Sequence, residues 1–304
     1  MDKAAVAADL QTLLKQPVII DSPMSKHTTW KIGGPADIMV FPTCEEELCA
    51  LLPRLKEQGI SWLVIGNGSN LLVADKGIRG VVIKMGENFA DSQWRGLTVK
   101  ASAGMLLASL ALEAAERGAA GIEFARGIPG SVGGAVRMNA GAYGSNIGNY
   151  VIKVEGVDYD GHRLSLSGSE LNFSYRDSSL FGLDAVVTYI YLQLLEGDRE
   201  EIMEKMKEYQ QKRFLAQPLE YPSCGSVFRN PANDHAGRLV EMAGLRGLRI
   251  GNAQVTTKHG NFIINLGGAK AQDVRELISE VQQQVYEYSG VRLEPEVKMV
   301  GDFD

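Results

Sequence analysis

Apolar residues recur at helical spacing in several segments of the chain. The first segment contains Val6, Leu10, Leu13 and Leu14, which an α-helix would place on one face. A capping box of Thr43 and Glu46 predicts the start of a second helix, which Gly59 ends after about Gln58. Further helices are expected near 105–117, 199–213 and 236–242, and from Gln272 to a stop at Gly290.

Shorter apolar runs bounded by glycine, proline or asparagine predict strands. These runs lie at 38–41, 62–65, 71–73, 81–85, 97–101, 185–195, 249–255, 261–265 and 292–300. Asp160-Gly161 predicts a tight hairpin turn. Charged and apolar residues alternate from Arg199 to Arg213, which predicts a surface helix that connects two domains. We expect the last hundred residues to form a separate α/β unit.

Length and composition indicate a globular protein of more than one domain. A chain of 304 residues suits two or three domains, and 45% hydrophobic with 22% charged residues is ordinary for such a protein. The net charge is −6, and no Lys/Arg cluster is dense enough to follow a phosphate backbone. Nucleic acid is therefore a poor candidate partner.

The cysteines and the amino-terminal segment indicate a cytoplasmic protein. Cys44, Cys49 and Cys224 show no metal-ligand spacing, so we expect no metal site, and an odd, sparse set argues against a disulfide framework. The first residues lack the long apolar core and cleavage site of a signal peptide. No apolar run reaches transmembrane length.

Glycine is concentrated in one segment. Nine of the 34 glycines lie between Gly118 and Gly148. Glycine lacks a Cβ and allows φ > 0, so such a backbone can approach a ligand closely and direct N–H groups at it. Gly133-Gly134 resembles a loop that enters a short helix, whose amino terminus would favour phosphate. Interleaved apolar residues argue against a flexible linker, and the segment suits a large anionic cofactor.

A second glycine loop runs from Gly66 to Asn70. It follows the strand at 62–65 but lacks a third glycine and leads into another strand, so it is not a Rossmann loop. Two interpretations stay open. The loop is either a turn that offers backbone N–H groups and the Ser69 hydroxyl to a diphosphate, or a plain hairpin turn.

Two further segments carry candidate polar chemistry. Arg176 is suited to hold a carboxylate with two parallel hydrogen bonds, although pairing with Asp177 at the surface is the simpler alternative. Ser226 lies in a loop stiffened by Pro222 and Pro231. This loop is no hydrolase elbow, because Gly-x-Ser-x-Gly is absent, and whether it is functional stays open on these residues alone.

Side chains repeat every second residue along an extended segment, so Glu294 and Glu296 fall on one side of theirs. Either one of them enters a site while the other faces solvent, or both are exposed charges. Cys224 has no flanking cation or histidine and is expected to be a small buried residue rather than a nucleophile. His259 is expected to be a structural imidazole.

Seven motifs, taken in order, resemble the UDP-N-acetylenolpyruvoylglucosamine reductase (MurB) family. They are TTWKIGGPA, VIGNGSNLL, GIEFARGIPGSVGGAVRMNAGAYG, YRDS, PSCGSVFRNP, HGNFIIN and LEPEV. The resemblance implies an α+β fold of the vanillyl-alcohol-oxidase (PCMH) type. It implies FAD-binding subdomains at 1–84 and 85–210 and a substrate-binding α/β domain at 211–304, with a return of the final strand to the first subdomain left open.

The resemblance also implies a reaction. A hydride from NADPH reduces FAD and is passed to the enolpyruvyl C3 of UDP-N-acetylglucosamine enolpyruvate, which gives UDP-N-acetylmuramate for peptidoglycan synthesis. By motif, Ser226 resembles the proton donor, and Arg176 and Glu296 resemble the pair that holds and polarises the substrate carboxylate. Asn230 and Arg213 resemble substrate contacts.

The two glycine loops carry over as the cradle of the FAD diphosphate and isoalloxazine. The residues so assigned are Gly66, Asn67, Gly68, Ser69, Asn70, Gly130, Ser131, Gly133, Gly134, Asn139, Gly141, Ala142 and Gly144. No histidine lies between His27 and His162, so these motifs offer no tether and FAD is expected to be non-covalent. We expect a monomer that does not insert into membranes.

One departure from the family concerns the substrate lid. The chain has no room for the tyrosine-bearing loop that longer members fold over the UDP-sugar, so it resembles the shorter subtype. Two other functions remain as alternatives: a different oxidoreductase of the same flavin fold, and a non-enzymatic module that binds flavin or a nucleotide sugar. The second would have no use for the convergence of Ser226, Arg176 and Glu296.

Overall fold

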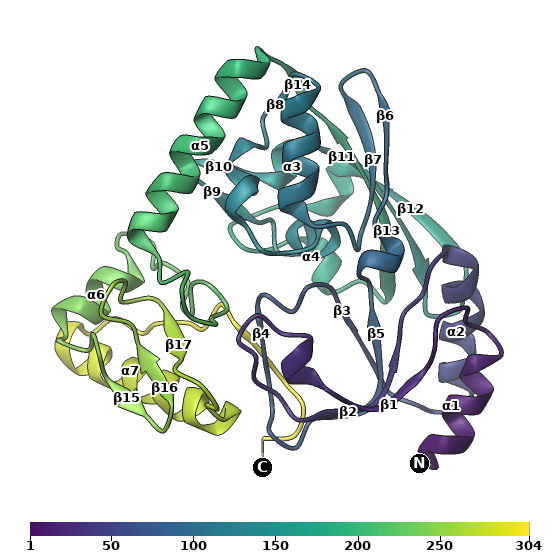
Figure 1. The fold of residues 1–304 in the computed structure, drawn as a ribbon, viewed down its shortest axis with the longest axis horizontal. Coiled ribbons are helices and arrows are strands. Elements are labelled where there is room, and N and C mark those ends of the chain that lie inside the picture. The colour runs from purple at the N-terminus through teal and green to yellow at the C-terminus, as the bar shows by residue number, and fades with distance from the viewer. Residues whose placement is uncertain (304) are drawn as a thin grey trace. The chain divides into compact units, whose positions relative to one another are not determined.

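The computed structural model describes residues 1–303, which form two compact units (Figure 1). Among these residues, unit 1 comprises 1–20, 38–67 and 80–212, and unit 2 comprises 21–37, 68–79 and 213–303. The chain therefore passes between the units five times. Three of these passages lie within strands, one lies within a helix, and one lies inside the glycine loop at 66–70.

The elements that pass between the units are β1 (Ile19–Pro23), β2 (Pro35–Val40), β5 (Ile78–Lys84) and α5 (Arg199–Ala216). The helices of unit 1 are α1 (Lys3–Gln11), α2 (Glu45–Glu57), α3 (Leu107–Glu116) and α4 (Val132–Arg137). Its strands are β3 (Trp62–Ile65), β6 (Ser92–Arg95), β7 (Thr98–Ser102), β8 (Ala119–Ala120), β9 (Gly141–Ala142), β10 (Ser145–Asn146), β11 (Val151–Asp158), β12 (Arg163–Ser167), β13 (Ala185–Gln193) and β14 (Leu195–Glu196).

Unit 2 contains the remaining regular elements. They are β4 (Leu71–Val73), α6 (Ala236–Met242), β15 (Arg249–Ile250), β16 (Ala253–Val255), β17 (Ile263–Asn265), α7 (Ala271–Ser289) and β18 (Lys298–Val300).

Short 3-10 helices lie in both units, at Met24–Lys26, Glu87–Phe89, Glu123–Gly127, Ile147–Asn149, Gly168–Leu171 and Ser179–Phe181.

A five-stranded antiparallel sheet in the order β12-β11-β13-β7-β6 forms the centre of unit 1. Along β13, buried residues such as Ile190 and Leu192 alternate with partly exposed ones, so one face of the sheet packs on the core. The expected hairpin turn at Asp160-Gly161 joins β11 to β12, and its backbone N–H groups at 160 and 162 donate to the Asp158 carboxylate.

A four-stranded sheet has the order β1-β2-β5-β3, in which β3 and β5 run parallel. The core of unit 1 also contains one face of α2, whose buried residues are Leu48, Leu51, Leu52 and Leu55. Figure 1 shows α1 beside α2, and Arg54 and Gln58 of the second helix region donate to the Asp9 carboxylate.

Unit 2 has its own apolar core. Helix α7 buries Val274, Leu277, Ile278, Val281 and Val285 at helical spacing, and it packs against the antiparallel sheet β15-β16-β17. Trp30 is fully buried in this core, and its indole N–H donates to the Ile263 carbonyl at 2.8 Å. Strand β18 pairs in parallel with β4.

Several expected boundaries are confirmed. Strand β3 and helix α6 have the predicted bounds, and α7 ends at Gly290 in the left-handed conformation with φ of 71°. The expected strand at 249–255 is instead a hairpin of β15 and β16 that turns at Gly251. The expected strand at 292–300 is also wrong in length, because only 298–300 are a strand and Pro295 makes an isolated bridge.

The predicted capping box of Thr43 and Glu46 is wrong by one residue. Helix α2 begins after Cys44, and Glu47 accepts hydrogen bonds from the Thr43 N–H and hydroxyl at 2.7 and 3.1 Å. The division at 84 and 210 stays a prediction. No helix within residues 1–303 combines the length and apolar character needed to cross a bilayer.

Candidate functional site

The first half of the loop at 66–70 belongs to unit 1 and lies against the second glycine-rich segment. Gly66 directly follows β3, and a Cβ added to it would lie 2.1 Å from the Ser131 hydroxyl oxygen. The Asn67 side-chain amide donates to the Pro129 carbonyl. Residues 66–67 and 129–131, including buried Gly130, therefore lie together, as expected for two parts of one cradle.

The second half of the loop belongs to unit 2. A Cβ on Gly68, whose φ is +64°, would lie 2.1 Å from the His27 carbonyl oxygen, so only glycine fits there. The Gly68 carbonyl accepts the Thr29 N–H at 3.3 Å. The Asn70 side chain donates to the Glu296 backbone carbonyl at 3.1 Å. The motif at 28–36, to which the sequence assigned no role, thus supports this loop.

Three backbone donors of the loop have no acceptor among the described residues. Within residues 1–303, the N–H groups of Asn67, Gly68 and Ser69 make no hydrogen bond. Successive unpaired N–H groups in a glycine turn form a concave site that suits an anion. This observation favours the diphosphate-binding interpretation of the loop over the plain hairpin turn.

Helix α4 has a different role. The Gly133 N–H donates to the Ala103 carbonyl at 2.9 Å, and the Gly134 N–H donates to the Ser131 hydroxyl at 3.3 Å. A Cβ on Gly133 would lie 2.8 Å from that of Ala103. The first turn of α4 is therefore already engaged, and glycine at 133 serves close packing. The cofactor contacts assigned to Gly133 and Gly134 stay predictions.

The asparagine at the end of the glycine-rich segment connects it to Arg176. Buried Asn139 donates to the Ser174 carbonyl at 2.7 Å and accepts the Gly148 N–H at 3.0 Å. The Arg176 guanidinium donates to the Gly141 carbonyl at 3.0 Å, and its backbone is left-handed with φ of 56°. Three predicted site residues, Asn139, Gly141 and Arg176, are thus adjacent in unit 1.

The hairpin β9–β10 starts at Gly141 and Ala142 and turns at Tyr143 and Gly144, which have φ of 54° and 81°. Tyr143 stacks on Tyr209 of α5, with ring centroids 4.1 Å apart and ring planes 6° apart, and its hydroxyl donates to the Tyr209 carbonyl at 3.0 Å. The helix α5 thereby holds the tip of the hairpin whose base contacts Arg176.

In unit 2 the loop that carries Ser226 is held by one asparagine. The buried Asn261 side chain accepts the Phe228 N–H and donates to the Phe228 carbonyl, both at 2.8 Å. The Val227 N–H donates to the Asn261 carbonyl at 2.9 Å. Ser226 itself is half-buried. Sequence reasoning missed Asn261, although it lies in the HGNFIIN motif.

Glu296 joins the same loop through its backbone. Its N–H donates to the Val227 carbonyl at 2.7 Å, and its side chain is half-buried whereas that of Glu294 is exposed. Cys224 is buried, and burial raises the pKa of its thiol, with a further contribution from the Glu296 charge. Cys224 is therefore confirmed as a small buried residue. The Glu294 carbonyl accepts the Arg229 N–H of the same loop at 2.9 Å, so both glutamates lie along the loop and differ in the exposure of their side chains.

The remaining predicted residues have local partners. The Asn230 side chain accepts the Ala236 N–H at 3.1 Å, at the start of α6. Arg213 lies in the last turn of α5. The His259 ring accepts the Asn261 N–H at 3.2 Å, and burial lowers the pKa of this histidine. This backbone partner agrees with the expected structural role of His259, and that role and the substrate contacts of Asn230 and Arg213 stay predictions.

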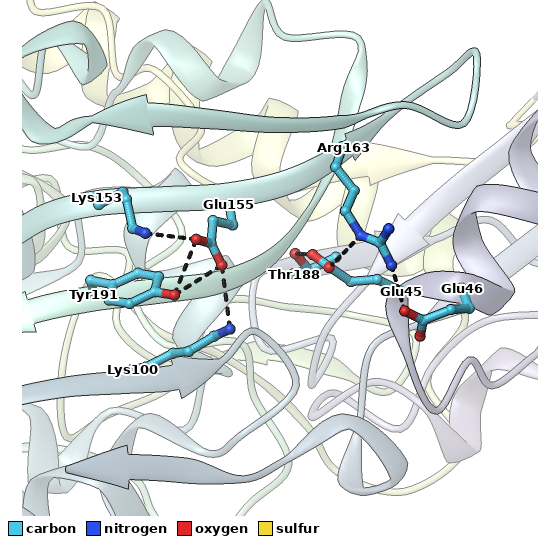
Figure 2. A network of polar contacts seen from close by, with 8 residues as sticks. All are labelled: Glu45, Glu46, Lys100, Lys153, Glu155, Arg163, Thr188 and Tyr191. Atoms are coloured by element: carbon cyan, nitrogen blue, oxygen red, sulfur yellow. Dashed lines mark hydrogen bonds and ion pairs between the residues drawn. The ribbon is translucent and has the colours of Figure 1, made fainter.

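A separate polar network lies on the five-stranded sheet of unit 1 (Figure 2). Glu155 accepts hydrogen bonds from the Tyr191 hydroxyl and from Lys153, and Lys100 lies 3.4 Å away. Burial opposes ionisation of Glu155, but these hydrogen bonds and charges outweigh it and lower its pKa. Figure 2 also draws the neighbouring group of Glu45, Glu46, Arg163 and Thr188. The carboxylates of both groups are paired with lysine or arginine side chains, so we interpret both groups as structural.

Arg176 belongs to unit 1, whereas Ser226 and Glu296 belong to unit 2. Within unit 2 the Glu296 backbone bonds to Val227, the neighbour of Ser226, and the joint action of these residues with the arginine stays a prediction. Within the described part of the chain, no group of three or more His, Cys, Asp or Glu side chains is arranged to hold a metal ion.

Comparison with known proteins agrees with this arrangement. Residues 36–167 match the family described as FAD binding domain, and residues 217–300 match the C-terminal domain of UDP-N-acetylenolpyruvoylglucosamine reductase. A reductase of that name from Heliobacterium modesticaldum is 48% identical over 281 residues, 92% of this chain and 90% of the relative. One from Moorella thermoacetica is 45% identical over 99% of both chains.

The crystal structure of UDP-N-acetylenolpyruvylglucosamine reductase (MurB) from Thermus caldophilus has the same fold. It superposes with a TM-score of 0.80 at 38% identity, covering 93% of this chain and 97% of that one. The α+β fold with an FAD-binding part and a C-terminal domain, inferred from seven motifs, is confirmed. The chain belongs to the UDP-N-acetylenolpyruvoylglucosamine reductase family.

Proposed function

We infer that this protein is an FAD-containing oxidoreductase that uses NADPH to reduce UDP-N-acetylglucosamine enolpyruvate to UDP-N-acetylmuramate, a step in peptidoglycan precursor synthesis. One observation carries this function: a single chain contains both the FAD-binding domain and the reductase C-terminal domain. The C-terminal match disfavours another flavin oxidoreductase. We further propose that the enzyme is a cytoplasmic monomer of the shorter subtype.

The loop residues fit FAD. The N–H groups at 67–69, which make no hydrogen bond within residues 1–303, suit the diphosphate. The glycines at 66 and 68 stand where a Cβ would meet other protein atoms. No histidine lies between His27 and His162 to tether a flavin, so we propose that FAD is held non-covalently. Bound at these residues, FAD would supply the redox chemistry, which is transfer of a hydride from NADPH to the enolpyruvyl C3 of the substrate.

Hydride addition at C3 leaves an electron pair at C2, which must take up a proton. We propose that the Ser226 hydroxyl donates it. A serine is a weak acid, but a fixed position lets it protonate a strongly basic carbon. The support for this role is the motif and the clamp of Asn261 on the neighbouring Phe228, which holds the loop without a regular strand.

We propose that Arg176 and Glu296 act on the substrate carboxylate. The guanidinium fork matches a carboxylate, and preorganised groups aimed at developing enolate charge contribute strongly to catalysis. The Arg176 side chain is held by its hydrogen bond to the Gly141 carbonyl. The Glu296 backbone is held by its hydrogen bond to the Val227 carbonyl. Glu294 is also held on this loop, where its carbonyl accepts the Arg229 N–H, but its side chain is exposed.

The function is tested on the purified protein. A yellow flavin that NADPH bleaches under anaerobic conditions, and that UDP-N-acetylglucosamine enolpyruvate reoxidises with formation of UDP-N-acetylmuramate, is the expected result. Acid precipitation should release the flavin into the supernatant, because no covalent bond retains it. Bleaching without reoxidation by this substrate would exclude the proposed reaction, and yellow colour in the pellet would exclude non-covalent binding.

Gly68→Ala should weaken FAD binding about tenfold or more. The methyl group meets the His27 carbonyl and the backbone is left-handed, so the loop must move. Gly96→Ala is the matched control, since Gly96 has φ of 58° but no atom within 4 Å of the added Cβ. The control should lose only about 1–2 kcal/mol of stability from backbone strain. The dissociation constant comes from titration of apoprotein, and equal affinities in both variants would contradict this prediction.

Ser226→Ala should separate the two half-reactions. Flavin bleaching by NADPH should be unchanged, because this step needs no protein acid, and substrate-driven reoxidation should slow by roughly 10²–10⁴-fold. Stopped-flow absorbance measures both. Ser223→Ala, in the same loop, is the control. If both half-reactions slow equally in Ser226→Ala, the serine holds the loop and is not the acid.

Arg176 and Glu296 should behave as one unit. Arg176→Lys should be nearly as slow as Arg176→Ala in substrate-driven reoxidation, because lysine lacks the planar fork. The double variant Arg176→Ala/Glu296→Ala should lose much less than the product of the single losses. Glu294→Gln is the control and should retain activity. Fully additive losses would mean that the two residues act at separate places.

A further inference from the structure

Lys84 ends β5 next to the glycine loop. Strands β3 and β5 are parallel, and their register places Lys84 opposite Ile65, directly before Gly66. The Lys84 ammonium donates to the Gly66 carbonyl at 3.2 Å. Ligands of parallel sheets bind beyond the carboxyl ends of the strands, and Lys84 occupies that end of the β3–β5 pair.

The Lys84 ammonium has no anionic partner within residues 1–303. The side chain is largely buried, yet no carboxylate lies within ion-pair distance of its nitrogen, and the Gly66 carbonyl is its one hydrogen-bond acceptor. Burial accordingly lowers the pKa of Lys84, and the more distant Glu87 charge opposes this only in part.

Other lysines of the same unit show the usual arrangement. Lys100 and Lys153 both lie close to the Glu155 carboxylate, and the pKa values of both are raised. Buried cations are generally paired, because desolvation without a counterion is costly. The lack of a carboxylate beside Lys84 in the ligand-free protein is therefore explained if the counterion of Lys84 is a ligand.

The surroundings of Lys84 identify the kind of ligand. Gly66 lies against Ser131, and the N–H group of the next residue, Asn67, has no acceptor among the residues that the structure describes. An ammonium has three donors, of which the Gly66 carbonyl uses one. Backbone donors and a cation beside one loop match a diphosphate, which offers several oxygens and negative charge.

We propose that Lys84 is a cofactor-binding residue whose charge pairs with the diphosphate of FAD. The proposal rests on the proposed function in requiring FAD as the ligand. The proposed role of Lys84 also has a consequence for the stability of the apoprotein. The apoprotein carries the cost of the unpaired cation, and this cost is offset only when the diphosphate binds.

The test compares Lys84→Met and Lys84→Gln with the wild type as apoproteins. Lys84→Met removes charge and donor, so it should weaken FAD binding about 10- to 100-fold, the effect of a lost charge-assisted hydrogen bond. Apo Lys84→Met should melt at the same temperature as wild type or higher. Lys84→Gln keeps a donor for the Gly66 carbonyl but no charge, and it should bind FAD as weakly as Lys84→Met.

ADP serves as a probe that has the diphosphate without the flavin. Its affinity should fall by the same factor as that of FAD, and the midpoint potential of bound flavin should not change. Lys100→Met, which removes a paired lysine of the same unit, is the control and should bind FAD normally.

Three results would overturn the proposal. They are wild-type affinity in Lys84→Gln, a destabilised Lys84→Met apoprotein with unchanged FAD affinity, and a shifted flavin potential with unchanged ADP affinity. A shifted potential with unchanged ADP affinity would mean that the Lys84 charge acts on the flavin ring and not on the diphosphate. Failure of the wild-type protein to bind FAD would instead refute the proposed function, so the two failures are distinguishable.

Discussion

The structure of unit 2 depends on the pairing of buried backbone groups in a loop that forms no strand of its own. Buried N–H and C=O groups need partners, and the segment around Ser226 obtains them from Asn261 and from the backbone of Glu296. The Asn261 side chain pairs with the Phe228 N–H and carbonyl, which in a sheet would pair with a neighbouring strand. The positions of Ser226 and Glu296, 70 residues apart, thus depend on the same few hydrogen bonds.

The glycine loop at 66–70 has a comparable constraint. Gly66 must admit the Ser131 hydroxyl, and Gly68 must admit the His27 carbonyl, so both positions exclude a side chain for steric reasons. In the same loop, the N–H groups of residues 67–69 have no acceptor in the part of the chain that the structure describes. Free donors and close approach are what an anionic cofactor requires, and they explain why the loop is rich in glycine although it has no Rossmann pattern.

Arg176 shows how backbone strain is balanced in unit 1. Both Arg176 and Tyr143 have left-handed backbones, which cost about 1–2 kcal/mol each for residues with a Cβ. The hydrogen bond from Arg176 to Gly141 and the stacking of Tyr143 on Tyr209 oppose that cost. Strain that is retained in this way is typical of functional sites, which agrees with the role proposed for Arg176.

The sequence by itself determined those features that local rules govern. The hairpin at Asp160-Gly161, the bounds of α6 and the stop of α7 at Gly290 follow from turn residues and helical periodicity. The ordered motifs identified the family, because each motif is a short continuous segment. Only the tertiary structure decided that the segment of Glu294 and Glu296 lies along the Ser226 loop with the Glu296 side chain half-buried, that β18 pairs with β4, and that Lys84 has no carboxylate within ion-pair distance among residues 1–303. These features depend on contacts between residues far apart in the chain, and such contacts leave no periodic or local signal in a single sequence.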